Sequence, residues 1–320
     1  MQVGIFFINF YRNTFALSCF CAIIKHMRSL FIVLFLIAPL AAQVKTVSLH
    51  PLLTDLVRRV GGEHATVIDL IGKNGDPHHF EPTANQLQET KGALLYFVSG
   101  KGLEAYLPSL KSIVKGQAKI IEVGETLPSI AGACDHSEEE HGAEEHAHEH
   151  GVDPHWWHSV ENFRRAVTVV VSELSAVDPA HASDFEKNGQ VYRKELDELD
   201  RWIRVEIAKI SKKQRQLATA HAAFGYFCKD HQFTVFSVQG INREQTPGAK
   251  ELADLIKSLK EHQVTAIFPE KESNPKVLET LTKDTGIALG EMLIADGTTM
   301  STYDQMMRHN VNAIVKALAP

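Results

Sequence analysis

The chain has 320 residues, of which 44% are hydrophobic and 22% are charged, and its formal net charge is -6 with histidine counted as neutral. This is the composition of a globular protein that can form a full core, and the length allows one large domain or two smaller ones. The acidic balance argues against a general nucleic-acid binder, so we expect no nucleic-acid partner.

Residues 1–42 have the features of an export signal. Met27-Arg28 precedes an apolar run over 30–40, and the small residues Ala41-Ala42 follow it. A positive start, a short apolar stretch and small residues at its end are typical of a signal peptide, and the run is short for a membrane span. We therefore expect export with cleavage near Ala42. The alternatives are a longer uncleaved anchor and a start misassigned at Met1, with Met27 the true one.

Residues 43–123 alternate short apolar strands with helices. Strands are expected at 46–49, 65–70, 94–98 and 119–123, and helices at 51–60, from about Thr83, and at 103–113. The run 94–98 is apolar throughout, which is the mark of a strand buried on both faces. Strands that alternate with helices indicate parallel pairing in an α/β layer architecture.

Residues 135–150 interrupt this alternation with a segment rich in Glu and His. It carries five histidines: His136, His141, His146, His148 and His150. Such a composition cannot bury apolar surface, so we expect a mobile loop. Imidazoles on a mobile chain predict secondary, low-affinity metal binding, because closing around an ion costs chain entropy. The alternative is a solvated insertion whose metal binding has no physiological use.

Two helical segments follow. Ser159 is the expected N-cap of a helix over 160–177, which Asp178-Pro179 ends. From 182 to 211 apolar residues recur at helical spacing without a proline, which predicts one helix of about 40 Å. Its position between two strand–helix arrays favours a connection between two lobes, and a core helix of a single domain is the alternative.

The second half repeats the alternation. Strands are expected at 216–219, 233–238, 264–268 and 287–293, and helices through Phe224 and Phe227 and at 248–261, 275–285 and 303–318. The predicted fold is therefore α/β, with two similar parallel-sheet lobes joined by a single long rigid helix. The predicted boundaries are 43–180 for the first lobe, 181–211 for the linker helix and 212–320 for the second lobe.

The tripeptide Asp-Pro-His occurs twice, at 76–78 and at 153–155. Proline fixes its own φ and restricts the residue before it, so this tripeptide presents one imidazole from a stiff loop. Imidazole is the commonest side-chain ligand for zinc and similar metals. One copy alone would be weak evidence, since Asp-Pro is ordinary turn chemistry.

Four candidate metal donors follow strand ends, two in each half: His78, His155, His221 and Asp296. In open parallel sheets, ligands bind beyond the carboxyl ends of the strands, so these donors would meet in the cleft between the lobes. Three imidazoles and one carboxylate satisfy a tetrahedral divalent metal and leave no position for water. The set therefore favours a protein that carries a metal over one that catalyses with it.

These residues resemble those of periplasmic metal-binding proteins of the ZnuA/TroA type, the solute-binding subunits of ABC importers for zinc or manganese. The resemblance covers residues 44–320, and the matching stretches are GDPHHFEPT at 75–83, DPHWW at 153–157, HAAFGYF at 221–227, the region of Asp296, and TYDQMM at 302–307. It implies metal ligands at the four candidate donors and two lobes joined by one rigid helix. It also implies a periplasmic location, a membrane permease and ATPase as partners, a monomer, and no enzymatic activity.

Residue 221 bears on the choice of metal. The resemblance implies glutamate here in manganese-type members, whereas this chain has His221. Imidazole suits zinc and carboxylate-rich shells suit manganese, so we expect one tight Zn²⁺ site. A manganese-specific member of the same importer family is one alternative. A secreted zinc-dependent hydrolase is another, but it would need an open coordination position and a general base, and the sequence has no HExxH motif. A histidine-rich zinc buffer or adhesion protein is the third.

Neighbouring residues have other expected roles. We expect His79 not to bind the metal. His158 could bind the metal or form a hydrogen bond nearby, and we expect it to orient a neighbour by a hydrogen bond. Trp156 and Trp157 are expected to pack in the core and the cleft wall. Glu81 either orients a ligand or stays a solvated charge.

The cysteines of the exported chain, Cys134 and Cys228, lack CxxC spacing. A thiolate zinc site is therefore excluded. Buried or free thiols are expected, with a single disulfide as the alternative in an oxidising compartment.

Overall fold

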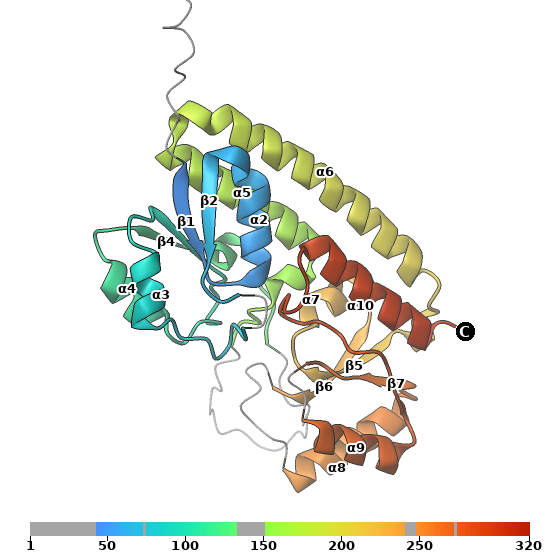
Figure 1. Cartoon of the computed structure of the whole chain (residues 1–320). Helices are drawn as coiled ribbons and strands as arrows, with labels where there is room; N and C mark the ends of the chain where they lie inside the picture. The colour runs from blue at the N-terminus through green and yellow to red at the C-terminus, as the bar shows by residue number, and fades with distance from the viewer. Residues whose placement is uncertain (1–42, 73–74, 133–150, 241–247, 272–273) are drawn as a thin grey trace, which may run out of the picture. The chain divides into compact units, whose positions relative to one another are not determined.

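The structure, a computed structural model, describes residues 43–72, 75–132, 151–240, 248–271 and 274–320. The predicted signal segment, the predicted histidine-rich loop and Cys134 lie outside the described residues. Within these ranges the chain forms two four-stranded parallel sheets with helices packed on them (Figure 1). No helix in the same ranges combines the length and the apolar character needed to cross a membrane.

The first sheet has the spatial order β2-β1-β3-β4, and every pair in it is parallel. Its strands are β1 (Val44–Ser48), β2 (Ala65–Asp69), β3 (Leu95–Val98) and β4 (Lys119–Glu122). Its helices are α2 (Pro51–Gly61), α3 (Ala84–Glu89) and α4 (Leu107–Val114). Successive side chains of β3 point to opposite faces. Tyr96 and Val98 join a core with α3 and α4, while Leu95 and Phe97 join a core with α2.

The second sheet repeats this topology in the order β6-β5-β7-β8, again all parallel. Its strands are β5 (Gln216–His221), β6 (Thr234–Gln239), β7 (Ala266–Phe268) and β8 (Ala288–Leu289). Its helices are α7 (Gly225–His231), α8 (Ala249–Glu261), α9 (Pro275–Thr285) and α10 (Tyr303–Leu318). Ala218 and Ile267 pack with α8 and α9, while Leu217 and Phe268 belong to the core that includes α7 and α10.

Two long helices, α5 (Val160–Val177) and α6 (Ala182–Ile207), connect the sheets (Figure 1). The buried face of α6 repeats at helical spacing through Phe185, Tyr192, Leu196, Leu199, Ile203 and Ile207. This face packs against α2, α5 and α10, and one apolar core runs along it from the first sheet to the second. The predicted fold of two similar parallel-sheet lobes and a long helix is confirmed, and the lobe boundaries at 180 and 211 stay predictions.

The long helix ends at Ile207, four residues before the predicted end. The guanidinium of Arg215 donates to the carbonyl oxygens of Ile207 at 3.3 Å and Ile210 at 3.2 Å. Carbonyls at a helix end have no partner within the helix. Arg215 supplies partners here, and the chain leaves the helix.

Strand β8 is two residues long, although the pattern predicted a strand over 287–293. After Leu289 the backbone presses against a ring, because a Cβ on Gly290 would lie 2.6 Å from Phe268. The paired strand ends there, and parallel pairing resumes only as an isolated bridge between Glu270 and Leu293.

Candidate metal site

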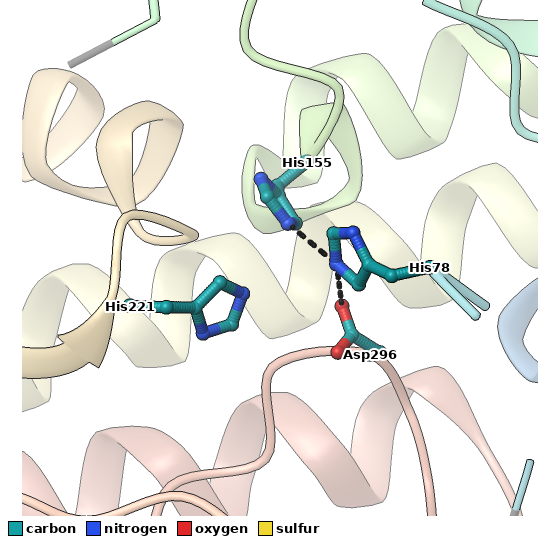
Figure 2. Close-up of side chains that lie close together, drawn as sticks. All are labelled: His78, His155, His221 and Asp296. Carbon is teal, nitrogen blue, oxygen red and sulfur yellow. Dashed lines mark hydrogen bonds and ion pairs between the residues drawn. The ribbon is translucent and has the colours of Figure 1, made fainter. Parts of the chain in front are cut away.

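The structure brings His78, His155, His221 and Asp296 together (Figure 2). One donor atom of each lies within 4.8 Å of the other three, and all four residues are buried. His78 lies between β2 and α3, and His155 lies just before the short 3-10 turn Trp156–His158 that leads into α5. His221 is the last residue of β5, and Asp296 lies between β8 and α10.

The two Asp-Pro-His tripeptides have the same backbone turn. In each, the aspartate Oδ1 accepts the backbone N–H of the histidine, at 3.0 Å for Asp76 and His78 and 2.9 Å for Asp153 and His155. The aspartates differ in the ring that they bind. Asp153 Oδ1 also lies 2.8 Å from Nδ1 of His155, whereas Asp76 Oδ2 lies 2.9 Å from Nδ1 of His79. His79 is exposed and lies outside the group of four, in line with its expected non-ligating role.

Carboxylates fix the tautomers of two of the three imidazoles. A carboxylate only accepts hydrogen bonds, so Nδ1 of His155 must donate to Asp153. Nδ1 of His221 donates in the same way to Glu270 Oε2, and Oε1 of that carboxylate accepts the His221 backbone N–H at 3.1 Å. Each Nε2 therefore carries a lone pair. Nε2 of His221 is buried and has no hydrogen-bond partner among the described residues.

The donor atoms form a group suited to a small cation. Nε2 of His155 lies 3.2 Å from Nε2 of His78, which lies 3.7 Å from Oδ1 of Asp296. Zinc bonds of about 2.0–2.1 Å place tetrahedral ligands about 3.3 Å apart, which is close to both separations. Burial lowers the pKa of His155 below 6.5, against an opposing effect of Asp153. This keeps the ring neutral and able to bind a metal.

Glu270 is a site residue that the sequence analysis missed. It is buried and follows the apolar strand β7, which pairs with β5. A carboxylate placed just after a buried strand, next to the strand that ends in His221, is a signal that could have identified it. It orients the ring of His221 in the way that carboxylates orient metal-binding histidines.

His50 and His158 also lie buried near the four residues. Nδ1 of His50 accepts the N–H of Leu52 at 3.2 Å and caps α2, and burial lowers the pKa of His50 to about 3. Burial likewise lowers the pKa of His158 to about 4, and its ring packs on Phe224 with centroids 4.3 Å apart. Both residues lie outside the group of four. Both ring nitrogens of His158 are buried without a hydrogen-bond partner among the described residues, so the orienting hydrogen bond expected from His158 is not found.

The remaining candidates are not among the four donors. Glu81 is exposed and outside the group. Cys228 is a buried free thiol, and burial raises its pKa. The indole nitrogens of both tryptophans donate hydrogen bonds, Trp156 to Ser99 and Trp157 to the carbonyl of Ala295. Trp157 therefore does more than pack in the core.

Comparisons with known proteins identify a family and similar folds. The model of a protein family described as ZnuA, zinc-uptake complex component A, periplasmic, matches residues 47–317. Manganese-binding lipoprotein MntA of Bacillus subtilis (strain 168) is 31% identical over 278 residues, which are 83% of this chain and 87% of that protein. Zinc-binding protein TroA of Treponema pallidum is 28% identical over 278 residues, 84% of this chain and 86% of that protein.

Solved structures match the fold. The periplasmic zinc-binding protein TroA of Treponema pallidum superposes with a TM-score of 0.76 at 27% identity, covering 87% of this chain and all of that chain. A manganese-bound periplasmic metal-binding protein of Candidatus Liberibacter asiaticus gives a TM-score of 0.75 at 19% identity, covering 86% of this chain. At that lower identity the likeness concerns the fold alone.

Proposed function

This chain belongs to the ZnuA family of periplasmic zinc-uptake components, which are metal-binding proteins of ABC importers and not enzymes, and we propose that it captures one Zn²⁺ ion and delivers it to a membrane permease. The proposed ligands are His78, His155, His221 and Asp296. The observation that carries the proposal is the convergence of these three imidazoles and one carboxylate at one buried point.

The chemistry of the donors favours zinc. Imidazole nitrogen is a good ligand for Zn²⁺, and four protein donors complete a tetrahedral shell. Two of the imidazoles are held by carboxylates, His155 by Asp153 and His221 by Glu270. Such carboxylate–histidine pairs raise the basicity of the nitrogen that faces the metal.

Manganese is the second candidate, because the relatives include proteins named manganese-binding, among them MntA of Bacillus subtilis. Mn²⁺ prefers carboxylate, carbonyl and water oxygens. Within the group of four donors this chain offers one carboxylate, Asp296. The donor chemistry therefore weighs against manganese.

A competition experiment decides between the two metals. The purified protein, stripped of metal, is equilibrated with equal concentrations of Zn²⁺ and Mn²⁺, and the bound metal is measured by mass spectrometry after gel filtration. We expect one equivalent of zinc and almost no manganese. Preferential binding of manganese would overturn the zinc assignment while leaving the metal site in place.

A swap at residue 221 tests the reason for the preference. His221→Glu replaces an imidazole with a carboxylate, so the zinc-to-manganese ratio in the same competition should fall at least tenfold. His79→Glu is the matched control, because His79 adjoins a proposed ligand but is exposed and outside the group. The control should keep the parent ratio. An unchanged ratio in His221→Glu would remove residue 221 from the site.

We place the protein in the periplasm, with the permease and ATPase of an ABC importer as partners, acting as a monomer. The family supports this placement. Sedimentation with and without zinc should give the monomer mass in both cases. A zinc-dependent dimer would contradict the monomer assignment alone.

The histidine-rich segment 135–150 is proposed as a secondary, low-affinity zinc-binding region. Its histidines, His136, His141, His146, His148 and His150, alternate with glutamates in a composition that does not form a preformed site. Deleting residues 136–150 should leave one tight zinc per chain in calorimetry and abolish the weaker binding. Loss of the tight site in this deletion would show that the segment supplies a primary ligand.

A further inference from the structure

The chain around Asp296 is attached to the first lobe, although it follows the last strand of the second sheet. The indole nitrogen of Trp157 donates to the carbonyl of Ala295, the residue before Asp296, at 2.7 Å. Trp157 lies two residues after His155 and is 1% exposed. One buried hydrogen bond therefore joins Ala295, next to Asp296, to Trp157, two residues from His155, across 138 positions of the sequence.

The far end of the same segment is also fixed to the first lobe. The hydroxyl of Tyr303 donates to the backbone carbonyl of Trp157 at 2.8 Å, and its ring stacks on Phe163 of α5 with centroids 3.7 Å apart. The backbone N–H of Tyr303 donates to Oδ2 of Asp55, on α2, at 3.0 Å. Trp157 thus binds both ends of the segment 295–303, through its indole and through its carbonyl.

The middle of the segment lies against α2. Gly297 has a φ of +75°, and a Cβ there would lie 2.5 Å from a methyl carbon of Leu52. Just before the segment the attachment is different, because Leu293 N–H donates to Pro269 at the end of β7 at 2.9 Å. The attachment of the chain therefore changes from the second sheet to the first lobe between Leu293 and Ala295.

We propose that Trp157 is a positioning residue of the metal site, which holds the carboxylate of Asp296 in a fixed place relative to His155. The inference rests on the proposed function, because it needs Asp296 to bind the metal. A ligand is useful only when its supporting contacts hold it within a fraction of an ångström of the right place. The Trp157 indole is the contact that supplies this restraint from the side of His155.

The test compares the two adjacent tryptophans. Trp157→Phe keeps an aromatic ring but removes the hydrogen bond to Ala295, and Zn²⁺ affinity, measured by competition with a chelator, should fall about 10–100-fold. Trp156→Phe is the matched control, since Trp156 is equally buried and its indole binds Ser99 within the first lobe. The control should change affinity less than threefold. Equal losses in both variants would overturn the proposal.

A double-mutant cycle separates positioning from general damage to the fold. In an Asp296→Ala background, Trp157→Phe should cause almost no further loss of zinc affinity, because the carboxylate that it positions is gone. A full additional loss would show that Trp157 acts in some other way. Thermal unfolding of the metal-free variants monitors folding separately from zinc affinity.

A milder variant serves if Trp157→Phe does not fold. Tyr303→Phe removes only the hydroxyl that holds the Trp157 carbonyl. It should weaken zinc binding in the parent chain and have no effect in the Asp296→Ala background, and an unchanged affinity in the parent would count against the inference. The single variant Asp296→Ala separates the proposed ligand set from the proposed positioning role of Trp157. If it leaves zinc affinity intact, the proposed ligand set is wrong; if it weakens binding while the Trp157 and Tyr303 variants do not, only the positioning role is wrong.

Discussion

At the level of single residues, one tripeptide is used in two ways. Both Asp-Pro-His turns hold the histidine backbone through the aspartate Oδ1, but only Asp153 also holds the ring of its own histidine. Asp76 binds His79 instead, so its carboxylate does not set the orientation of the His78 ring. Because of this difference, the same substitution should have unequal effects in the two turns.

We expect Asp153→Asn to weaken zinc binding about tenfold or more, because it removes the negative charge that fixes the His155 tautomer. Asp76→Asn should change affinity less than threefold. Asparagine can still accept the backbone hydrogen bond of the turn, so the pair isolates the effect on the ring. Chelator competition measures both, and equal effects would show that the turn, not the ring contact, is what the site requires.

Glu270 leads to a second prediction at this scale. Glu270→Gln removes the charge that holds Nδ1–H of His221, and zinc affinity should fall about 10–100-fold. Glu291→Gln is the control, since Glu291 lies at the surface and pairs with Lys316. The control should leave calorimetric zinc binding as in the parent. An unchanged zinc affinity in Glu270→Gln would mean that packing alone orients His221.

The four proposed ligands could be predicted from the sequence because each follows a strand end and two lie in a repeated tripeptide. Glu270 and Trp157 could not be identified, because their roles depend on contacts between distant parts of the chain. Glu270 binds a residue 49 positions away, and Trp157 binds one 138 positions away. No local pattern contains such a pairing, whereas a strand end and a turn are local patterns.

At the level of elements, helix limits were predicted correctly where the signal is local. Helices α5, α9 and α10 have the predicted bounds. Their N-caps, Ser159, Asn274 and Thr302, each accept a backbone N–H two or three residues ahead, as cap residues do. The end of α6 was predicted four residues too late, because the Arg215 side chain that binds its last carbonyls comes from beyond the helix.

Arg215 should therefore matter for stability. Its guanidinium reaches the carbonyls of Ile207, Ile210 and His231, and so joins the ends of α6 and α7. Arg215→Lys keeps the charge but loses the forked geometry, so the free energy of unfolding should fall by about 1–3 kcal/mol. Arg201→Lys, at an exposed position of α6, is the control and should stay within about 0.5 kcal/mol. Urea denaturation of the metal-free protein measures the free energy of unfolding of both variants. Equal losses in Arg215→Lys and Arg201→Lys would rule out the capping role of Arg215.

Buried histidines predict a loss of stability in acid. His231, the last residue of α7, is buried, and this burial lowers its pKa from 6.5 to about 4. Below pH 6.5 the unfolded chain binds a proton that the folded protein refuses, so stability falls as the pH drops towards 4. The contribution of His231 between pH 6.5 and 5 is about 2 kcal/mol.

Urea denaturation of the metal-free protein over this pH range tests the prediction. His231→Gln should flatten the decline, while the remaining slope reflects groups such as His50 and His158, whose pKa values are about 3 and 4. An identical slope in the parent and the variant would show that folding does not change the pKa of His231.

At the level of the whole described chain, the repeated topology explains where the metal site forms. It does not explain how the four proposed ligands are shared between the two lobes. Both sheets have the first strand of the lobe next to the third, and the carboxyl ends of their strands carry the proposed ligands. The sequence predicted two donors from each lobe. The contacts of Trp157 and Tyr303 attach Asp296 to the lobe of His78 and His155. We therefore propose that the ligands divide three to one, with Asp296 on the side of His78 and His155, although Ile294 beside it also bonds Asn310 of α10.

This division predicts which distances change when zinc leaves. Spin labels are placed at the exposed positions Ile113 on α4, Lys257 on α8 and Asn312 on α10, with Cys134 and Cys228 replaced. Removing zinc takes away the ion that joins His221 to the other three donors, so the Ile113–Lys257 distance should increase by about 2 Å or more.

The Ile113–Asn312 distance should stay constant in the same experiment, because Tyr303 at the start of α10 binds Asp55 of α2 and α10 packs on α2 and α6. Double electron–electron resonance measures both distances in one set of samples. A shift of both distances together would show that α10 and Asp296 move with the second sheet. The three-to-one division requires instead that His221 moves away from the other three ligands. During delivery, the zinc ion would then be held by His78, His155 and Asp296 alone, with one side open to a permease.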